Sequence, residues 1–316
     1  MTSDEITELF LSHTEEPRRR LAAGGRLVHY TSAEAAYKII QGRQIWLRNA
    51  SMMNDFSEIQ HGINCLAAAW NSDAGASLKE LLKRLKPGLC DELEKLFDGH
   101  ADAMRLSTFI TSLSEHRDEE DQLGRLSMWR AYGGRAGVAL VLNNTAFVAT
   151  TDEMKVFSSP VFYLDVDAFQ TWFAEWVDKL IAHEGQLTTL QPEHIQNILF
   201  VVFRNFALCT KHPGFSEERE WRVYHSPSFE GQSDWLSSSV EIIGNIPQHV
   251  IKLSLHDDKA KAISGVAPAS LVNRVIIGPC EHPIHVRASI AGALVEAGVT
   301  DPLDRMWMSF IPLRQA

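Results

Sequence analysis

Residues 216–223 read Ser-Glu-Glu-Arg-Glu-Trp-Arg-Val, where closely spaced carboxylates lead into an apolar, β-branched segment. If Glu220 to Tyr224 form a strand, Glu218 and Glu220 project from the same face and Arg219 from the opposite one, because side chains alternate along a strand. Two neighbouring carboxylates repel each other unless a cation lies beside them, and Arg219 and Arg222 are close in sequence. The run therefore predicts a strand that carries a functional site. A solvated strand edge of alternating charge is the alternative.

Outward from this run, short strands and helices follow each other without a regular strand–helix repeat. Many strands lack the crossover helix that a doubly wound parallel sheet requires. We therefore predict an α+β fold with a mixed, mostly antiparallel sheet, in one domain over residues 26–316. A polar leader of one helix is expected at 1–25. Helical insertions are expected at about 72–104 and 166–208, and residues 192–208 of the second are strongly apolar.

The composition of the 316-residue chain is that of an ordinary soluble globular protein, with 45% hydrophobic and 22% charged residues. Its net charge of −10 argues against nucleic-acid binding driven by overall charge, and leaves a local basic patch open. Four cysteines without a C-x-x-C pair indicate reduced thiols in a cytoplasmic protein. No apolar run approaches the roughly 20 residues that span a bilayer, and the acidic N-terminus lacks a secretory signal. We therefore expect no membrane contact.

Several common enzyme fingerprints are missing from the chain. It has no G-x-G-x-x-G after a strand, no G-x-x-x-x-G-K-[ST] phosphate loop and no G-x-S-x-G nucleophile elbow. His282 and His285 have a spacing that metal ligands use, with Cys280 nearby. Pro283 suits the first turn of a helix, and no second ligand cluster accompanies the two histidines. We therefore predict no metal site here.

Short motifs on both sides of the acidic run together resemble a known family. They are His29-Tyr30-Thr31, Ile45-Trp46-Leu47 after Gly42, Asn54-Asp55 with Glu58, Ser112-Leu113-Ser114-Glu115, Trp129-x-x-Tyr132, Gly137-Val138-Ala139-Leu140, the run from Glu218 to Val223, and Val275-Ile276-Ile277-Gly278-Pro279. In this order they resemble a widespread bacterial family that is catalogued as a domain of unknown function. The resemblance covers about residues 27–313, and it implies no reaction.

A more distant resemblance is to the ADP-ribosyltransferase fold. Enzymes of that superfamily place a His or Arg on the first core strand and a Ser or Tyr on a central strand. Their catalytic Glu, often within a Glu-x-Glu pair, lies on or just before a later strand. His29 matches the first position and Glu220 the third, with Glu218 as the preceding acid. Ser112 and Tyr132 are both candidates for the middle position, and the resemblance implies NAD as a substrate.

The same resemblance implies a role for each matched residue. His29 would hold the adenosine ribose of NAD. Cleavage of the nicotinamide bond builds positive charge on the other ribose, as in the oxocarbenium-like state of glycoside hydrolysis, and a preorganised carboxylate stabilises such a charge. We expect Glu220 to supply this carboxylate, and Glu218 to orient or deprotonate the acceptor.

Further side chains are expected to contact the NAD. Tyr30 and Trp129 would stack on its rings, and Arg48 or Arg222 would bind its pyrophosphate in a bidentate manner. The alternative for Trp129, which shares a helical face with Tyr132, is a place in the core. The complete set of expected NAD-binding residues is His29, Tyr30, Thr31, Arg48, Ser112, Trp129, Tyr132 and Arg222.

These expectations combine into an NAD-dependent, ADP-ribosyltransferase-like enzyme that acts in the cytoplasm. Its acceptor would be a protein or a nucleic acid. By family-level analogy the protein would serve as a toxin or an antiphage defence effector, with a neutralising partner protein.

Two other functions stay open at this point. A metal-dependent hydrolase or nuclease would gather Asp55, Glu58, Glu218 and Glu220 around magnesium. No lysine completes the D…E-x-K pattern of a common nuclease type, which counts against that function. A non-catalytic sensor or partner-binding module would instead use the acidic loop at 115–121 and the many aromatic side chains.

Overall fold

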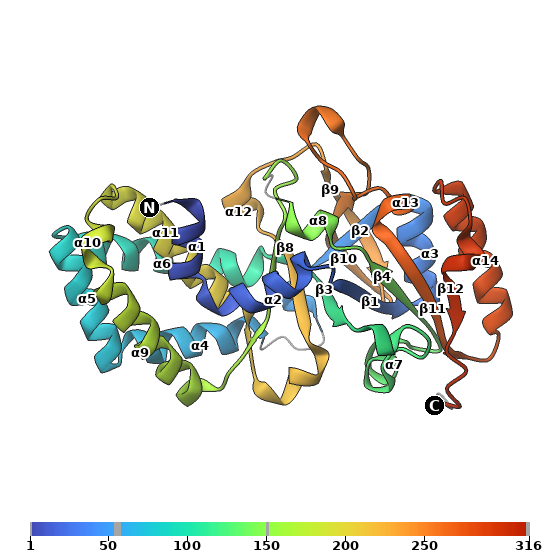
Figure 1. Cartoon of the computed structure of the whole chain (residues 1–316), viewed down its shortest axis with the longest axis horizontal. Helices are drawn as coiled ribbons and strands as arrows, with labels where there is room; N and C mark the ends of the chain where they lie inside the picture. The colour runs from blue at the N-terminus through green and yellow to red at the C-terminus, as the bar shows by residue number, and fades with distance from the viewer. Residues whose placement is uncertain (1, 54–57, 150–151, 314–316) are drawn as a thin grey trace.

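The computed structural model describes residues 2–53, 58–149 and 152–313, which fold into a sheet-based half and a helical half (Figure 1). The strands of the main sheet are β1 (Arg26–Ser32), β2 (Gln44–Asn49), β3 (Phe109–His116), β4 (Ala136–Leu142), β5 (Phe157–Pro160), β8 (Glu220–His225), β9 (Leu236–Ile243), β10 (Ile246–Ser254), β11 (Val272–Cys280) and β12 (Met306–Met308). A second, two-stranded sheet pairs β6 (Phe162–Tyr163) with β7 (Thr210–Lys211).

The main sheet runs in the order β12-β11-β4-β1-β3-β2-β10-β9, and β8 pairs with β3 and β5 beside this path. The strands β11 and β12 are parallel, whereas the other described pairs of this sheet are antiparallel. This confirms the predicted α+β class with a mostly antiparallel sheet. Hydrophobic side chains of β1, β4 and β11 form the core of this half together with two helices, α3 (Ala33–Gly42) and α14 (Pro283–Glu296).

The helical half packs around an aromatic core. Its helices are α1 (Ser3–Phe10), α4 (Glu58–Trp70), α5 (Asp73–Leu85), α6 (Leu89–Leu106), α9 (Val166–Ala182), α10 (Glu184–Leu187) and α11 (Pro192–Cys209). Asp165 caps α9 by accepting from Ala168 N, and Pro192 suits the first turn of α11. The predicted helices at 72–104 and 166–208 are thus present, and they pack on one another through Phe169, Trp176 and Phe206 among others.

The N-terminal residues differ from the single helix expected there. They form α1, which belongs to the helical half, and α2 (Ser12–Ala22), which leads from that half to the sheet-based half (Figure 1). Phe10 is buried in the core of the helical half, whereas Leu21 is buried in the core beside the sheet. Arg18 Nη2 also donates to Ser158 O at 2.6 Å. Because its apolar side chains reach both cores, this segment is an integral part of the fold.

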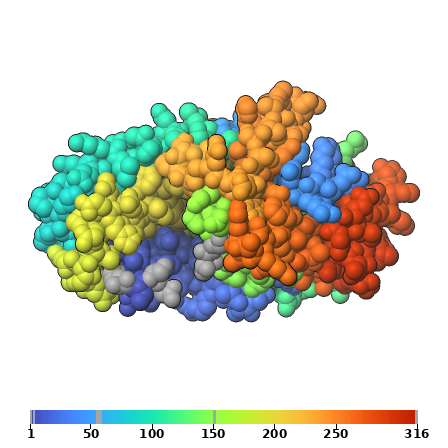
Figure 2. Space-filling model, turned by 90° about the horizontal axis from the view of Figure 1, so that it is seen from above, coloured from blue at the N-terminus to red at the C-terminus, as the bar shows by residue number. Residues whose placement is uncertain are grey.

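The remaining α-helices are short: α7 (Leu126–Tyr132), α8 (Thr145–Val148), α12 (Pro227–Glu230) and α13 (Pro268–Leu271). The molecule as a whole is elongated (Figure 1). Figure 2 shows the helical half in cyan and yellow-green at one end and α14 in red at the other. Among the residues that the structure describes, no helix is long and apolar enough to cross a membrane.

The register of the central strands positions the site. Ser112 of β3 pairs with Arg222 of β8, and Ser114 pairs with Glu220 two residues further along the antiparallel ladder. β1 lies on the other side of β3, with Val28 opposite Ser114. Side chains from β1, β3 and β8 therefore come close together, although the strands are far apart in sequence.

Candidate functional site

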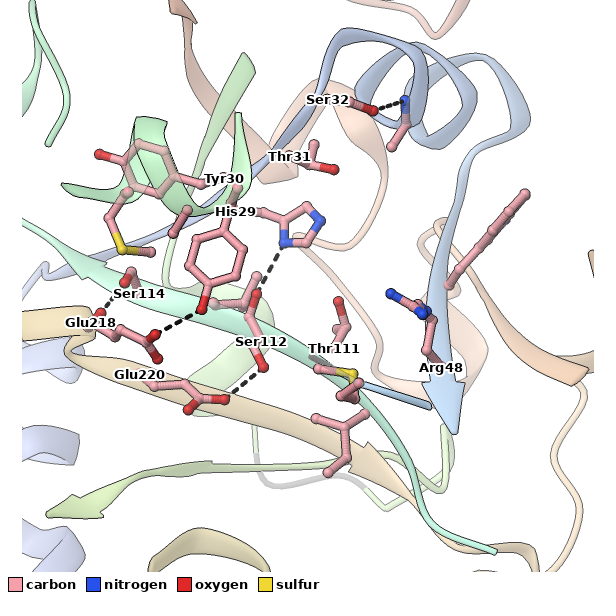
Figure 3. A pocket seen from close by; sticks show the side chains of 18 of the residues that line it. His29, Tyr30, Thr31, Ser32, Arg48, Thr111, Ser112, Ser114, Glu218 and Glu220 are labelled. Carbon is pink, nitrogen blue, oxygen red and sulfur yellow. Dashed lines mark hydrogen bonds between the residues drawn. The ribbon is translucent and has the colours of Figure 1, made fainter. Parts of the chain in front are cut away.

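A pocket of about 990 Å³ opens beside β1, β3 and the start of β8 (Figure 3). Its volume lies at the upper end of the range for small-molecule and cofactor sites, roughly 300–1,000 Å³. Eight of the ten side chains predicted for the site line this pocket: His29, Tyr30, Thr31, Arg48, Ser112, Tyr132, Glu218 and Glu220.

The two glutamates lie in different kinds of backbone. Glu220 begins β8, whereas Glu218 ends a 3-10 helix, η3 (Pro213–Glu218), and Arg219 between them adopts a left-handed conformation with φ of 46°. Both carboxylates still reach one cation, Lys211, whose Nζ lies 2.7 Å from Glu218 Oε2 and 3.1 Å from Glu220 Oε2. The arginine between them turns away and pairs with Glu120. The predicted pairing of the two carboxylates thus occurs, through a turn followed by a strand.

Glu220 is the deeper of the two carboxylates, with only 4% of its side chain exposed. Arg222 Nε donates to its Oε1 at 3.0 Å, and Ser112 Oγ donates to the same oxygen at 2.6 Å. Burial alone would raise the pKa of Glu220, but the charges of Arg222 and Lys211 and the hydrogen bonds from Arg222 and Ser112 outweigh it, so the pKa lies well below its ordinary value. Glu220 is therefore an ionised, fully partnered anchor.

The lowered pKa of Glu220 gives a test in the stability of the protein. A depressed carboxyl pKa stabilises the fold above the pKa of the unfolded chain, and this contribution is lost as the pH falls through the folded-state pKa. We expect Glu220→Gln to be less stable than the wild type at pH 7, and the difference to shrink steadily as the pH falls below 4.5. Denaturant unfolding at a series of pH values measures it; a constant difference would contradict the argument.

Glu218 is the more accessible carboxylate, with 18% of its side chain exposed. Tyr132 OH donates to its Oε1 at 2.7 Å. Burial and this hydrogen bond raise the pKa of Tyr132, so the phenol stays protonated and remains a donor. Ser114 Oγ and Arg125 donate to the main-chain carbonyl of Glu218. The carboxylate is thus held on both sides while part of it faces the pocket.

His29 lies on β1 and lines the same pocket as these two carboxylates (Figure 3). Its Nδ1 is 3.0 Å from Ser112 O. Because a carbonyl oxygen only accepts, Nδ1 carries the proton in this bond, and Nε2 is left as an acceptor in the neutral ring. Burial lowers the pKa of His29, which favours this neutral form at pH 7. His29 can therefore accept a hydrogen bond from a bound hydroxyl.

Arg48 lies at the other end of the pocket from the glutamates (Figure 3). Its Nη2 donates to Met52 O at 2.9 Å and to Gln248 Oε1 at 3.2 Å. Lys38 of α3 also lines the pocket, where its Nζ pairs with Glu34 at 2.7 Å. The two glutamates thus share the cation Lys211 at one end of the pocket, and Arg48 lies at the other.

Two of the predicted NAD-binding residues lie elsewhere. Trp129 is fully buried, donates from Nε1 to Leu123 O at 2.8 Å, and packs edge-on against Tyr30. Arg222 is also fully buried, between Glu220 and Leu208 O. Neither side chain lines the pocket, so the predictions of a stacking Trp129 and a pyrophosphate-binding Arg222 were wrong. Trp129 points into the core from α7, which was the alternative for it. Arg222 is enclosed between Glu220 and the end of α11.

Trp129 also explains two glycines of the motifs. A Cβ at Gly278 would lie 2.7 Å from Cε3 and Cζ3 of the buried indole, and a Cβ at Gly137 would lie 2.9 Å from Cε3. These are sub-contact distances to a rigid ring. The glycines of β4 and β11 therefore make room for Trp129, which in turn supports Tyr30 at the pocket wall.

Substitution of one of these glycines should destabilise the protein. Gly278→Ala forces the methyl group into the Trp129 ring, and overpacking of a filled core costs about 1–3 kcal/mol. The control is Gly292→Ala in α14, where a Cβ meets nothing within 4 Å and alanine is the better helix former. Urea unfolding of the two variants measures the difference. Equal stability would show that the indole has room to move.

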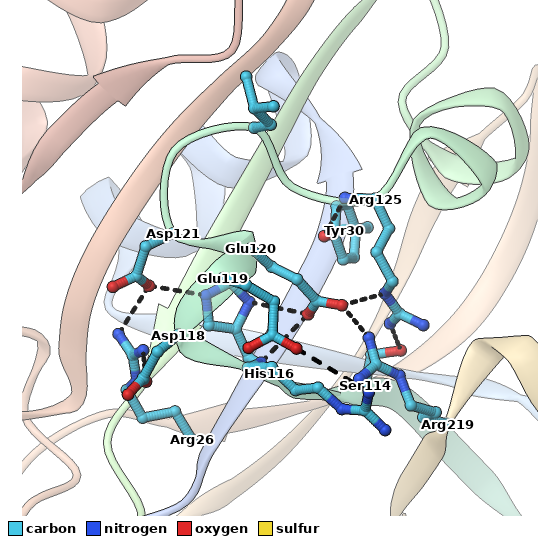
Figure 4. A network of polar contacts seen from close by, with 12 residues as sticks. Arg26, Tyr30, Ser114, His116, Asp118, Glu119, Glu120, Asp121, Arg125 and Arg219 are labelled. Atoms are coloured by element: carbon cyan, nitrogen blue, oxygen red, sulfur yellow. Dashed lines mark hydrogen bonds and ion pairs between the residues drawn. The ribbon is translucent and has the colours of Figure 1, made fainter.

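The acidic loop at 115–121, proposed as a partner surface, directs several of its carboxylates at cationic side chains of the protein itself (Figure 4). Glu120 pairs with Arg219 and lies 3.6 Å from Arg125 Nε. Asp121 Oδ1 accepts from His116 Nε2 at 2.9 Å and pairs with Arg26 at the same distance. These contacts tie the loop to the backbone that carries Glu218.

The acidic pair is contacted by further side chains that the sequence did not predict for the site. Lys211 is the main one, and Arg125 and Tyr163, whose hydroxyl accepts from Glu220 N at 2.7 Å, are others. The acidic pair itself was the available signal for Lys211, because two carboxylates call for a cation, and Lys211 lies only seven residues before Glu218. Arg125 and Tyr163 come from elements that no local pattern connects to the pair.

The alternative magnesium site can be compared with this geometry. Asp55 lies outside the described residues, and the side chain of Glu58 is likewise not described. Both Glu218 and Glu220 direct a carboxylate oxygen at the Lys211 ammonium group. Lys211 therefore lies where a bridging divalent ion would bind these two carboxylates.

Comparison with known proteins finds a family model that matches part of the chain. Residues 128–223 match the model of a family described as a protein of unknown function, DUF2971. No curated protein and no solved structure matches the chain. The matched segment runs from α7 to β8 and contains Tyr132, Lys211, Glu218 and Glu220. The part of the chain that carries the acidic pair thus matches the DUF2971 family, and the predicted relation to a domain-of-unknown-function family is confirmed.

Proposed function

We propose that the protein consumes NAD as an ADP-ribosyltransferase-like enzyme: it cleaves the bond between nicotinamide and ribose and transfers ADP-ribose to an acceptor. One observation carries this proposal. His29, the Ser112 and Tyr132 hydroxyls and the Glu218–Glu220 pair come from four separate segments of the chain and line one pocket. These are the three positions that the superfamily resemblance requires, in the expected order along the chain.

The charges of the pocket support NAD as the substrate. NAD carries a cationic nicotinamide ring at one end and an anionic pyrophosphate nearer its middle. The pocket has Glu218 at one end and Arg48 at the other (Figure 3). A nicotinamide ring near Glu218 and a pyrophosphate towards Arg48 would match opposite charges at both places.

The exposed fractions favour Glu218 as the carboxylate that faces the reacting ribose. Glu220 has 4% of its side chain exposed and Glu218 has 18%. When the bond breaks, neutral nicotinamide leaves with the electron pair and the ribose carbon becomes electron-poor. An ionised Glu218 would stabilise that charge. The acceptor then attacks the carbon and loses its proton, with Glu218 as a nearby base. Glu218 would thus take both roles that the resemblance divided between the two glutamates, and Glu220 would hold the pair in place.

The wider setting follows from the same chemistry. A protein or nucleic-acid acceptor, action as a toxin or antiphage effector, and a neutralising partner protein are what such a reaction implies by analogy. The four cysteines are free, which fits a reducing compartment such as the cytoplasm.

The test is release of nicotinamide from NAD by the purified protein, with and without bacterial lysate. Release that increases with lysate indicates a macromolecular acceptor, and release without lysate indicates that water serves. No release in either condition, together with no change of melting temperature on addition of NAD, would refute the proposal.

A further inference from the structure

We propose that Lys211 is a positioning residue that fixes the direction of the Glu218 carboxylate by tying it to Glu220. The inference deepens the proposed function, because it assigns a role to a side chain that neither the resemblance nor the sequence indicated. Its effect on turnover rests on that function, whereas its effect on the carboxylate pair does not.

The position of Lys211 is fixed by the fold. It ends β7, directly after the apolar helix α11, and pairs with Tyr163 of β6. Only 4% of its side chain is exposed, and its Nζ lies 4.7 Å from the centre of the Phe215 ring. A buried ammonium group is stable only when it is paired and hydrogen-bonded. The two carboxylates provide that pairing.

The two carboxylates depend on Lys211 to different degrees. The carboxylate of Glu220 also accepts hydrogen bonds from Arg222 and Ser112, so its direction is set without Lys211. For the side chain of Glu218, the described contacts are Lys211 and the Tyr132 hydroxyl. Of these two, only Lys211 carries a charge. Glu220 is thus the fixed anchor, Lys211 is the link, and Glu218 is the group that is positioned.

Removal of the link has a consequence of definite sign. Without the ammonium group, Glu218 and Glu220 are two carboxylates that shared one cation and now face each other. Two negative charges that both contacted the same ammonium group repel each other once that group is gone. Neutralising Glu218 should then relieve strain, whereas in the wild type the same change removes a favourable contact.

The decisive experiment is a double-mutant cycle of Lys211→Met and Glu218→Gln, read out by thermal unfolding without any ligand. Methionine keeps the length of the lysine stem and removes the charge. We expect Glu218→Gln to lower or leave unchanged the melting temperature of the wild type, and to raise that of Lys211→Met. Additive changes would overturn the proposal.

The cycle also decides the case in which Lys211→Met does not fold. Recovery of a folded protein by the added Glu218→Gln change supports the proposal, because it shows that repulsion of Glu218 was the defect. If the double variant also fails to fold while Glu218→Gln alone folds, Lys211 acts on folding by another route and the proposal is wrong.

Turnover provides a second measurement. We expect Lys211→Arg, which keeps the cation, to retain most nicotinamide release. Lys211→Met should lose about 100-fold in kcat with little change in KM, as expected when a transition-state contact is misplaced. A merely structural lysine would affect both variants alike. If the wild type releases no nicotinamide, the proposed function fails, and the unfolding cycle still decides the role of Lys211.

Discussion

Glu218→Gln is expected to lower the kcat of nicotinamide release by 100- to 1,000-fold or more, the order seen when a preorganised electrostatic contact to a transition state is removed. Glutamine keeps the shape of the side chain, and its single amide oxygen can still accept from either Tyr132 or Lys211. It cannot balance the positive charge that develops on the ribose. The melting temperature should change little, because the side chain is partly exposed. Chromatography of released nicotinamide measures the effect.

The matched control is Glu217→Gln, the same change one residue earlier in η3. The side chain of Glu217 is exposed and lies outside the pocket, so this variant should release nicotinamide at the wild-type rate. If Glu218→Gln stays active while Glu220→Gln does not, the catalytic role returns to Glu220. Equal activity of all three variants would separate the acidic pair from the reaction altogether.

Arg222→Met is expected to cost about 3–5 kcal/mol of the free energy of unfolding, the usual effect of removing one partner from a buried ion pair. Arg222 is fully buried and contacts Glu220 through Nε at 3.0 Å and Nη2 at 3.3 Å. The methionine would fill most of the space but leave Glu220 buried with fewer partners. Guanidinium unfolding at pH 7 gives the number.

The chain offers a close control for this variant. Arg84 contacts Glu184 in the same two-pronged way, with Nε at 2.8 Å and Nη2 at 2.9 Å, but the pair lies on the surface. Exposed ion pairs contribute little to stability, so Arg84→Met should leave the unfolding curve almost unchanged. A similar loss in both variants would mean that burial does not set the energy of the Arg222 pair.

The parts of the fold that could be predicted are those with local patterns. The apolar periodicity of residues 192–208 located α11, and the alternation after Glu220 located β8. The same alternation brought Glu218 and Glu220 together in the prediction, and the structure keeps them together even though Glu218 belongs to a turn. The strand expected from Glu220 to Tyr224 is present as β8, and the two carboxylates meet although Glu218 precedes it in a 3-10 helix.

The errors came from questions that a local pattern cannot answer. The spacing of Trp129 and Tyr132 showed one helical face, but not that the indole would fill the space above Gly278 while the phenol reached the pocket. The acidic pair likewise indicated that a cation lies beside it, but not that Lys211 contacts both carboxylates. Side chains that meet through tertiary packing have no periodicity to detect.

The bridging N-terminal segment sets an order of events during synthesis. His13 of α2 bonds Asn205 of α11, a partner 192 residues further along the chain. At about 5–20 residues per second, roughly 10–40 s pass between the synthesis of the two. The helix α2 is therefore synthesised well before its partner in α11, and contacts this distant in sequence slow folding.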